Sequence, residues 1–210
     1  GALPLLVTWP VGLMFPLALP LGLGQVFERL EGAVAELLAD TPFLEWLPMR
    51  AVELQPLMPA TQSLCVALGL MLPVLLAYSV IPQRTTRLQA LGLLLLVAWA
   101  ATSLSGALTF GPMQIWAWLT APALLGLALG MLASLAAAWL GMRASLVLLL
   151  VAALVHASLV NLAPTDVYFD QTLQTWEQGR FIRFNGLAQW LGWLWPYALI
   201  ADVMRRLARP

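Results

Sequence analysis

Residues 156–196, which read HASLVNLAPTDVYFDQTLQTWEQGRFIRFNGLAQWLGWLWP, decide how this chain is organised. The stretch holds the only histidine, three acidic residues, two arginines, two asparagines and four of the ten tryptophans. Apolar sequence flanks it on both sides. We therefore expect the rest of the chain to form helices that hold this polar block at one face of a membrane.

The composition excludes an ordinary water-soluble domain. Of 210 residues, 61% are hydrophobic and 10% are charged, and the mean hydropathy is +0.87. Because a soluble domain averages about 25% charged residues, most of this surface must face lipid. All ten basic residues are arginines and ten acids balance them, so no basic patch for nucleic acid is expected. The single cysteine, Cys65, excludes an intrachain disulfide and a cysteine-based metal cluster.

The apolar stretches predict an all-α fold, a polytopic transmembrane helix bundle that forms a single membrane domain over residues 1–210. A membrane crossing needs about 20 apolar residues, and six such stretches occur. The predicted spans are 3–23, 61–81, 88–110, 115–140, 144–163 and 187–207. The first span is the least regular, because its four prolines remove backbone hydrogen bonds and kink or unwind a helix.

Two polar segments, 25–60 and 164–186, are predicted on one side of the membrane. In residues 25–40, apolar side chains recur every three or four positions opposite Glu28, Glu31 and Glu36. This pattern predicts an amphipathic interfacial helix that covers the bundle as a lid. The side chains predicted to face the bundle or lipid are Phe27, Leu30, Val34 and Leu37.

A second short outer helix is predicted within 164–186. Asp166 is its expected N-cap, and Gly179 its expected stop. In an alternative interpretation, Asp166, Asp170 and Glu177 converge into a carboxylate group for a cation or for acid–base chemistry.

The charges of the connecting segments predict the orientation. Segments 25–60, 111–115 and 164–186 carry nine acids and four arginines, whereas the other side carries six arginines and one acid. The positive-inside rule places the arginine-rich side in the cytoplasm. Both termini are then cytoplasmic, and the location is the bacterial inner membrane.

Small residues recur every four positions on two predicted spans. Such faces let helix backbones approach closely in lipid, and we expect them to pack within the chain rather than to drive dimerisation. These residues are Gly126, Gly130, Ser134 and Ala138 on one span, and Ala98, Thr102 and Gly106 on another.

His156 and Asn161 are the polar side chains singled out in the fifth predicted span. His156 is either a proton relay or ligand, or a neutral histidine bonded to a neighbouring helix. Asn161 is expected to satisfy backbone carbonyls freed where Pro164 ends the span.

Arg180 and Arg183 alternate with apolar residues, so in an extended segment both would face the same way. They can grip a phosphate of a lipid-linked substrate, reach headgroups, or pair with nearby acids. Aromatic residues near them suit an interfacial belt. With the two arginines, the candidate contacts to lipid or a partner are Trp176, Trp190, Trp193 and Tyr197.

No phosphate-binding loop, Ser-His-Asp set, haem attachment motif or metal-ligand cluster occurs in the sequence. We therefore predict no cofactor, no metal and no catalytic residue. The predicted membrane interior offers too few ionisable groups for acid–base catalysis or ion coupling at depth.

The block from Asn161 to Tyr197, with its runs NLAP, QTWEQGRFIRFNGLAQW and LWPY, resembles the C-terminal end of longer proteobacterial members of the VanZ-like membrane protein family. Residues 15–29, FPLALPLGLGQVFER, are similar to the opening of the same C-terminal half. The resemblance implies an integral membrane protein of the cell envelope, in a family without an established biochemical activity. It also implies an upstream helical module of the same protein. No functional residue is carried over.

Two main classes of function follow from these observations. In the first, the protein is non-catalytic, and its outer face, 164–186, contacts lipid headgroups, envelope polymers or a partner. In the second, the chain is a structural or accessory subunit packed against a larger membrane protein complex. An enzyme or transporter for a lipid-linked substrate is a third, less favoured class.

Overall fold

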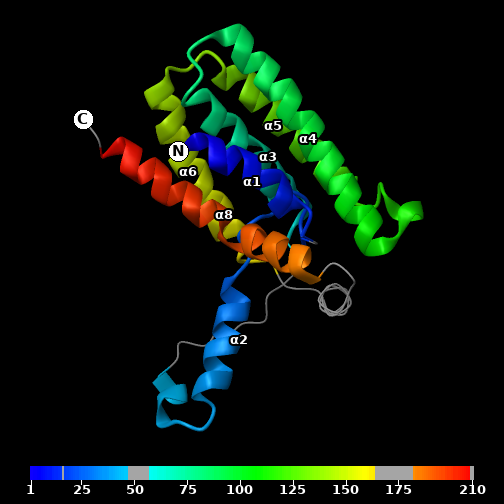
Figure 1. Ribbon diagram of the computed structural model, residues 1–210, viewed down its shortest axis with the longest axis vertical. Helices are drawn as coiled ribbons and strands as arrows, with labels where there is room; N and C mark the ends of the chain where they lie inside the picture. Colours follow the sequence, from blue (N-terminus) through cyan, green and yellow to red (C-terminus); the bar gives the residue numbers. More distant parts are fainter. Residues whose placement is uncertain (16, 47–56, 164–181, 209–210) are drawn as a thin grey trace.

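The computed structural model describes residues 1–15, 17–46, 57–163 and 182–208, with only the backbone of 182–185. These residues are helical and contain no strand, which confirms the all-α prediction. The α-helices, labelled as in Figure 1, are α1 (Ala2–Leu13), α2 (Phe27–Leu38), α3 (Pro59–Tyr78), α4 (Arg84–Phe110), α5 (Ala121–Ala137), α6 (Met142–Val160) and α8 (Ile182–Leu207). Two short 3-10 helices are η1 (Pro42–Trp46) and η2 (Pro112–Gln114).

Three of the described helices, α3, α4 and α6, are long and apolar enough to cross a membrane. Six such helices were expected. Two further apolar helices, α1 and α5, have 12 and 17 residues, and the 26-residue α8 is more polar. The coarse prediction of membrane-spanning helices thus holds for three of the six.

Helix α1 is much shorter than the predicted span 3–23. It ends at Leu13, because Pro16 offers no backbone N–H and disfavours helical geometry in the residue before it. Twelve residues rise roughly 18 Å, well short of the roughly 30 Å hydrocarbon core. The described part of residues 14–26, called here the linker, is not helical, and in it Leu21 has a φ of 60° and Gly24 a φ of 100°.

Helix α5 begins at Ala121 and not at position 115. Pro122 occupies the first turn, where a missing N–H costs nothing, and Thr120 accepts a hydrogen bond from the Ala123 N–H at 3.4 Å. Residues 111–120 instead form η2 and turns. They connect α4 to α5.

Helix α3 forms the centre of the bundle and packs against α5, α6, α4 and α1. The predicted small face of α5 lies against it. A Cβ added to Gly126 would lie 2.5 Å from the Ser63 carbonyl oxygen, and one added to Gly130 would lie 2.9 Å from that of Ala67. The expectation of packing within the chain is confirmed, since only glycine permits this approach.

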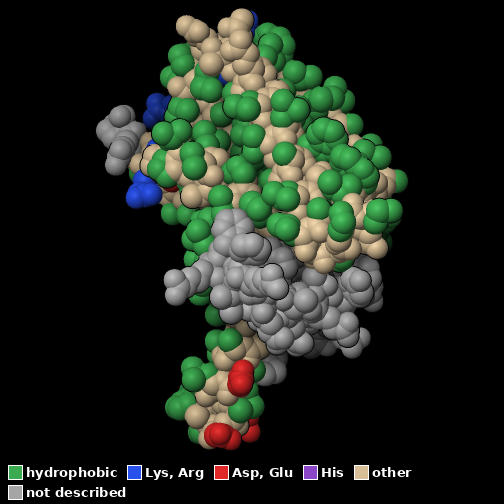
Figure 2. Space-filling view, turned by 45° about the vertical axis from the view of Figure 1, so that its right-hand side comes forward, with side chains coloured by type: hydrophobic (Ala, Val, Ile, Leu, Met, Phe, Trp, Pro, Cys, Tyr) green, Lys and Arg blue, Asp and Glu red, His purple; other side chains and the backbone are tan. Residues whose placement is uncertain are grey.

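Most of the described arginines lie at one end of the molecule and most of the described acidic side chains at the other (Figure 2), with Asp202 among the arginines and Arg29 on α2 as exceptions. The arginine end carries Arg84, Arg87, Arg143, Arg205 and Arg206. At the opposite end, the arm end, α2 leaves the bundle, and the acidic residues from Glu28 to Glu45 lie on α2, on η1 and, for Asp40, in the turn between them.

Arg87 is not a surface charge of the arginine end, as the charge pattern implied, but a buried clamp with 3% of its surface exposed. Its guanidinium donates to the Tyr78 and Ile81 carbonyls after α3, at 2.8 and 2.7 Å. It also donates to the Ala138 carbonyl after α5 at 3.1 Å, and to that of Leu140. One guanidinium thus binds carbonyls that have no partner within their helices, at the negative ends of two helix dipoles.

Helix α2 matches the prediction of a helix within 25–40, but it is not a lid. It projects from the bundle, and none of its residues is buried (Figure 1). Leu30 and Leu37 expose 58% and 80% of their surface. Among the described residues, this helix contacts the bundle at its first turn, through Phe27 and Arg29.

Candidate functional site

Asn161, the C-cap of α6, is the organising residue of the arm end and is 4% exposed. Its Oδ1 accepts hydrogen bonds from the N–H groups of Val26 at 2.9 Å and Phe27 at 3.0 Å. These donors open α2, and Val26 at the N-cap has no capping side chain. A residue 135 positions away therefore supplies the cap of α2.

The amide nitrogen of Asn161 ties the linker to two helices. It donates its two hydrogens to the carbonyl oxygens of Ala157 at 2.7 Å and Gly24 at 2.9 Å, and the Tyr197 hydroxyl oxygen lies 3.1 Å from it. The Tyr197 hydroxyl in turn donates to the Gly24 carbonyl at 2.9 Å. Asn161 thus binds one carbonyl of its own helix and one of the linker, and α8 takes part through Tyr197.

Gly24 fits this junction only because it lacks a side chain. Its φ of 100° is strained for other residues, and a Cβ there would lie 2.9 Å from Cγ of Pro196. Its N–H donates to the Gly192 carbonyl at 2.8 Å. Next to it, the Gln25 amide donates to the Ala163 carbonyl at 2.7 Å. The linker, α6 and α8 are thereby held together in one junction.

The predicted aromatic residues on α8 gather beside this junction. Trp193 makes edge contacts with Phe15 and Trp190, at centroid distances of 6.1 and 5.6 Å. The Arg29 guanidinium lies 5.2 Å from the Trp193 ring, which joins the base of α2 to α8. Trp190 is 59% exposed, so it is the member of the set with surface available for contact.

His156 is fully buried inside the bundle. Its ring lies beside the backbone of Cys65 on α3 and Leu23 in the linker. Neither ring nitrogen makes a hydrogen bond of regular geometry with a described residue. This position favours the interpretation as a neutral histidine packed against its neighbours over a relay, which would need a chain of polar groups leading to a surface.

Several predicted contacts lie outside the described residues, namely Trp176, Arg180 and the carboxylates Asp166, Asp170 and Glu177. Arg183 falls within α8, which begins at Ile182. The backbone at Arg183 is therefore helical, not the extended conformation considered from the sequence. The helix begins five residues before the span predicted at 187–207, despite the turn-forming pair Asn185-Gly186.

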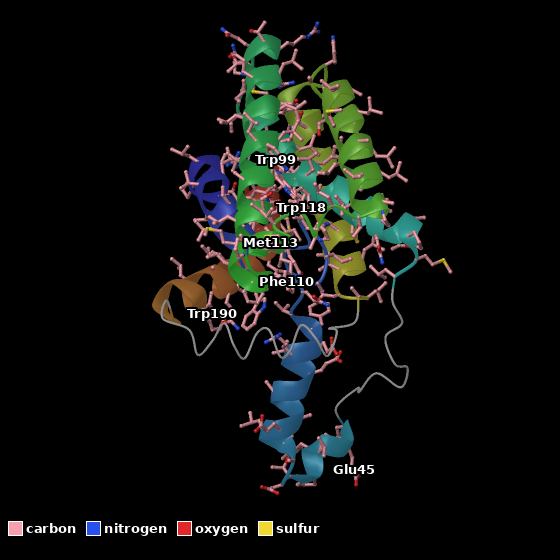
Figure 3. The ribbon with its side chains drawn as sticks, turned by 90° about the vertical axis from the view of Figure 1, so that its right-hand side faces the viewer. Glu45, Trp99, Phe110, Met113, Trp118 and Trp190 are labelled. Carbon is pink, nitrogen blue, oxygen red and sulfur yellow. The ribbon has the colours of Figure 1, made fainter. Side chains whose placement is uncertain are left out.

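A cavity of about 350 Å³, which the sequence did not indicate, lies between the linker and the second half of α4. The cavity exists because α1 ends at Leu13 and so does not extend beside this part of α4. The turns after α4 form another of its walls. Trp118, Met113 and Phe110 follow one another toward the arm in Figure 3, and of these Trp118 and Phe110 line the cavity. Its walls include Leu13, Phe15, Leu21, Thr102, Ser105 and Thr109.

Among the described residues, no three His, Cys, Asp or Glu side chains are grouped so that they could hold a metal ion. Comparison of the chain with known protein families, with curated proteins and with solved structures gives no match.

Proposed function

We propose that this chain is a non-catalytic integral membrane protein of the bacterial cell envelope that works by contact at its arm end. The observation that carries the proposal is the arm itself, formed by α2 and η1. It is fixed at its base by Asn161 and offers exposed apolar side chains along its length. A helix so firmly oriented and so poorly covered is suited to binding a partner.

The chemistry of the arm favours a protein partner over a lipid surface. Residues 27–46 carry five acids against one arginine, and headgroups of bacterial membranes attract basic helices, not acidic ones. Leu37 and Trp46 expose 80% and 79% of their surface. The partner therefore has an apolar groove with a basic rim, into which the apolar side of α2 fits.

The proposed topology follows the separation of charges. The arginine end lies in the cytoplasm and the arm end outside, with both termini cytoplasmic. In this arrangement α1 and the linker together make one broken crossing, which is covered by α8. Irregular backbone at membrane depth is tolerated where other protein covers it, and Gly24 bonds to Gly192 on α8 in this way.

Two further elements belong to this proposal. We propose that the chain is a member of a VanZ-like family, and that Arg180 and Arg183 make contacts on the same outer face as the arm. An accessory subunit of a larger membrane complex would use the arm as its contact, so the two function classes converge on one test.

A photoreactive benzophenone residue placed at Leu37 tests the arm in intact cells. We expect it to yield a covalent adduct of discrete mass, whereas the same residue at Gly32, on the opposite side of α2, yields none. Changing Leu30 to Glu should weaken the Leu37 adduct strongly. Equal adducts from both positions, or adducts with lipid alone, would argue against a protein contact.

A further inference from the structure

We propose that the cavity between the linker and α4 binds one acyl chain of a membrane phospholipid. This site is separate from the arm, and the proposal does not depend on the function suggested for the arm. It rests on the cavity's chemistry, its position along α4 and one hydroxyl group without a partner.

The described residues that line the cavity carry no charge. Leu13, Phe15 and Leu21 expose 1 to 2% of their surface and form an apolar wall. Thr102 and Ser105 face them from α4, but both hydroxyls already donate to backbone carbonyls, at 2.7 Å to Ala98 and 3.1 Å to Met14. An ion or a charged headgroup would find no counter-charge here, so the occupant is a neutral hydrocarbon.

The position of the cavity along α4 indicates where such a hydrocarbon would come from. It lies along the second half of α4, a candidate membrane span, whose Leu104 and Leu108 are exposed on the outside of the same helix. Hydrocarbon chains are the solvent at that depth.

The volume of the cavity and the unpartnered hydroxyl of Thr109 narrow the choice of occupant further. About 350 Å³ is at the lower end of the roughly 300–1,000 Å³ found for ligand sites, so it admits one chain and not a whole two-chain lipid. Thr109, in the cavity wall, has a buried hydroxyl without a hydrogen-bond partner among the described residues. An acyl ester carbonyl would supply the missing acceptor after rotation of that side chain.

A phosphatidylglycerol that carries a diazirine within one acyl chain tests the site on the whole chain in lipid nanodiscs. Bulk lipid has little access to Leu13 and Leu21, which are 1% exposed, but reaches Val151 on α6, which is 52% exposed. We expect labelling of Leu13 and Leu21 to saturate as the probe fraction rises, while labelling of Val151 rises in proportion. A proportional rise at all three positions, or none at Leu13 and Leu21, would overturn the proposal.

Two glycines on α4 provide a matched pair of variants. Gly106→Leu places a side chain in the cavity wall, and Gly92→Leu places the same side chain in open space on the same helix. Gly106→Leu should lower labelling of Leu13 about tenfold, as expected from losing roughly two methylene contacts. Gly92→Leu should leave it unchanged.

If Gly106→Leu fails to fold, Ala18→Leu fills the cavity from the linker side and must give the same loss. Unchanged labelling in a folded cavity-filling variant would exclude the cavity as the binding site. Stronger labelling of Leu13 by an isoprenyl alcohol with the same diazirine would exclude an acyl chain as the preferred occupant.

Discussion

The side chains of Asn161 and Tyr197, from the end of α6 and the middle of α8, lie 3.1 Å apart and both donate a hydrogen bond to the Gly24 carbonyl oxygen. A carbonyl oxygen has two lone pairs, and here both are used. This arrangement fixes the end of the linker, and with it the direction in which α2 leaves the bundle.

Replacing Asn161 by leucine should therefore destabilise the protein and release α2. Buried partners lose their hydrogen bonds on three segments, so we expect about 3 kcal/mol of lost unfolding free energy. The measurement is equilibrium unfolding in mixed micelles, followed by tryptophan fluorescence and circular dichroism. Tyr197→Phe, which removes one donor to Gly24, is the matched control and should cost about 1 kcal/mol. Equal stability of the two variants would contradict a central role for Asn161.

Arg87 should be far less replaceable than its neighbour Arg84 on the first turn of the same helix. Arg87→Gln leaves carbonyls after α3 and α5 without donors in a buried place, which we expect to cost about 3 kcal/mol. Arg84 is exposed, and Arg84→Gln should change stability by less than about 0.5 kcal/mol. Thermal unfolding of both variants in the same detergent makes the comparison. A wild-type melting temperature for Arg87→Gln would refute the clamp.

The α3–α5 contact should tolerate no methyl group at Gly126. Gly126→Ala would press a Cβ against the Ser63 carbonyl oxygen, 2.5 Å away, and separate the helices at a cost of about 2 kcal/mol. Gly92→Ala meets open space and should be neutral or slightly stabilising, because alanine favours helix over glycine. Similar unfolding midpoints for the two variants would mean that the close approach does not contribute to stability.

The proposed orientation predicts which ends of the protein a membrane-impermeant maleimide reaches in intact cells. Glu45→Cys on the arm should react, and Gln83→Cys at the arginine end should react only after the membrane is opened. Both positions are exposed, whereas the native Cys65 is fully buried and should stay unlabelled in the folded protein. The reverse pattern would invert the topology.

Helices α3, α4 and α6 could be predicted from sequence because each is one apolar run with clear stops, such as Gly111 before Pro112 at the end of α4. The prolines of the first span indicated irregular backbone, but not where the helix ends. Sequence patterns within the first span do not reveal the contacts of the linker with other helices. Those contacts decide how much of the linker remains non-helical.

The two most connected polar residues show a different limit. The charge pattern counted Arg87 as a surface cation, since its acceptors after α5 lie more than 50 positions away in sequence. Asn161 was expected to bind carbonyls near it in sequence, and it binds that of Ala157 four positions before it. The α2 N–H groups that it caps are 134 and 135 positions away, and no spacing rule links them.

The support of α1 by α8 has a consequence for biogenesis. The Trp195 indole donates to the Leu5 carbonyl at 2.8 Å across 190 positions of sequence. The ribosome therefore delivers α1 long before its covering helix exists. Contacts between segments far apart in sequence form late. The short helix α1 must therefore be held at the translocon or by an insertion chaperone until α8 has been synthesised. A nascent chain arrested before α8 should accordingly be degraded faster than the complete protein.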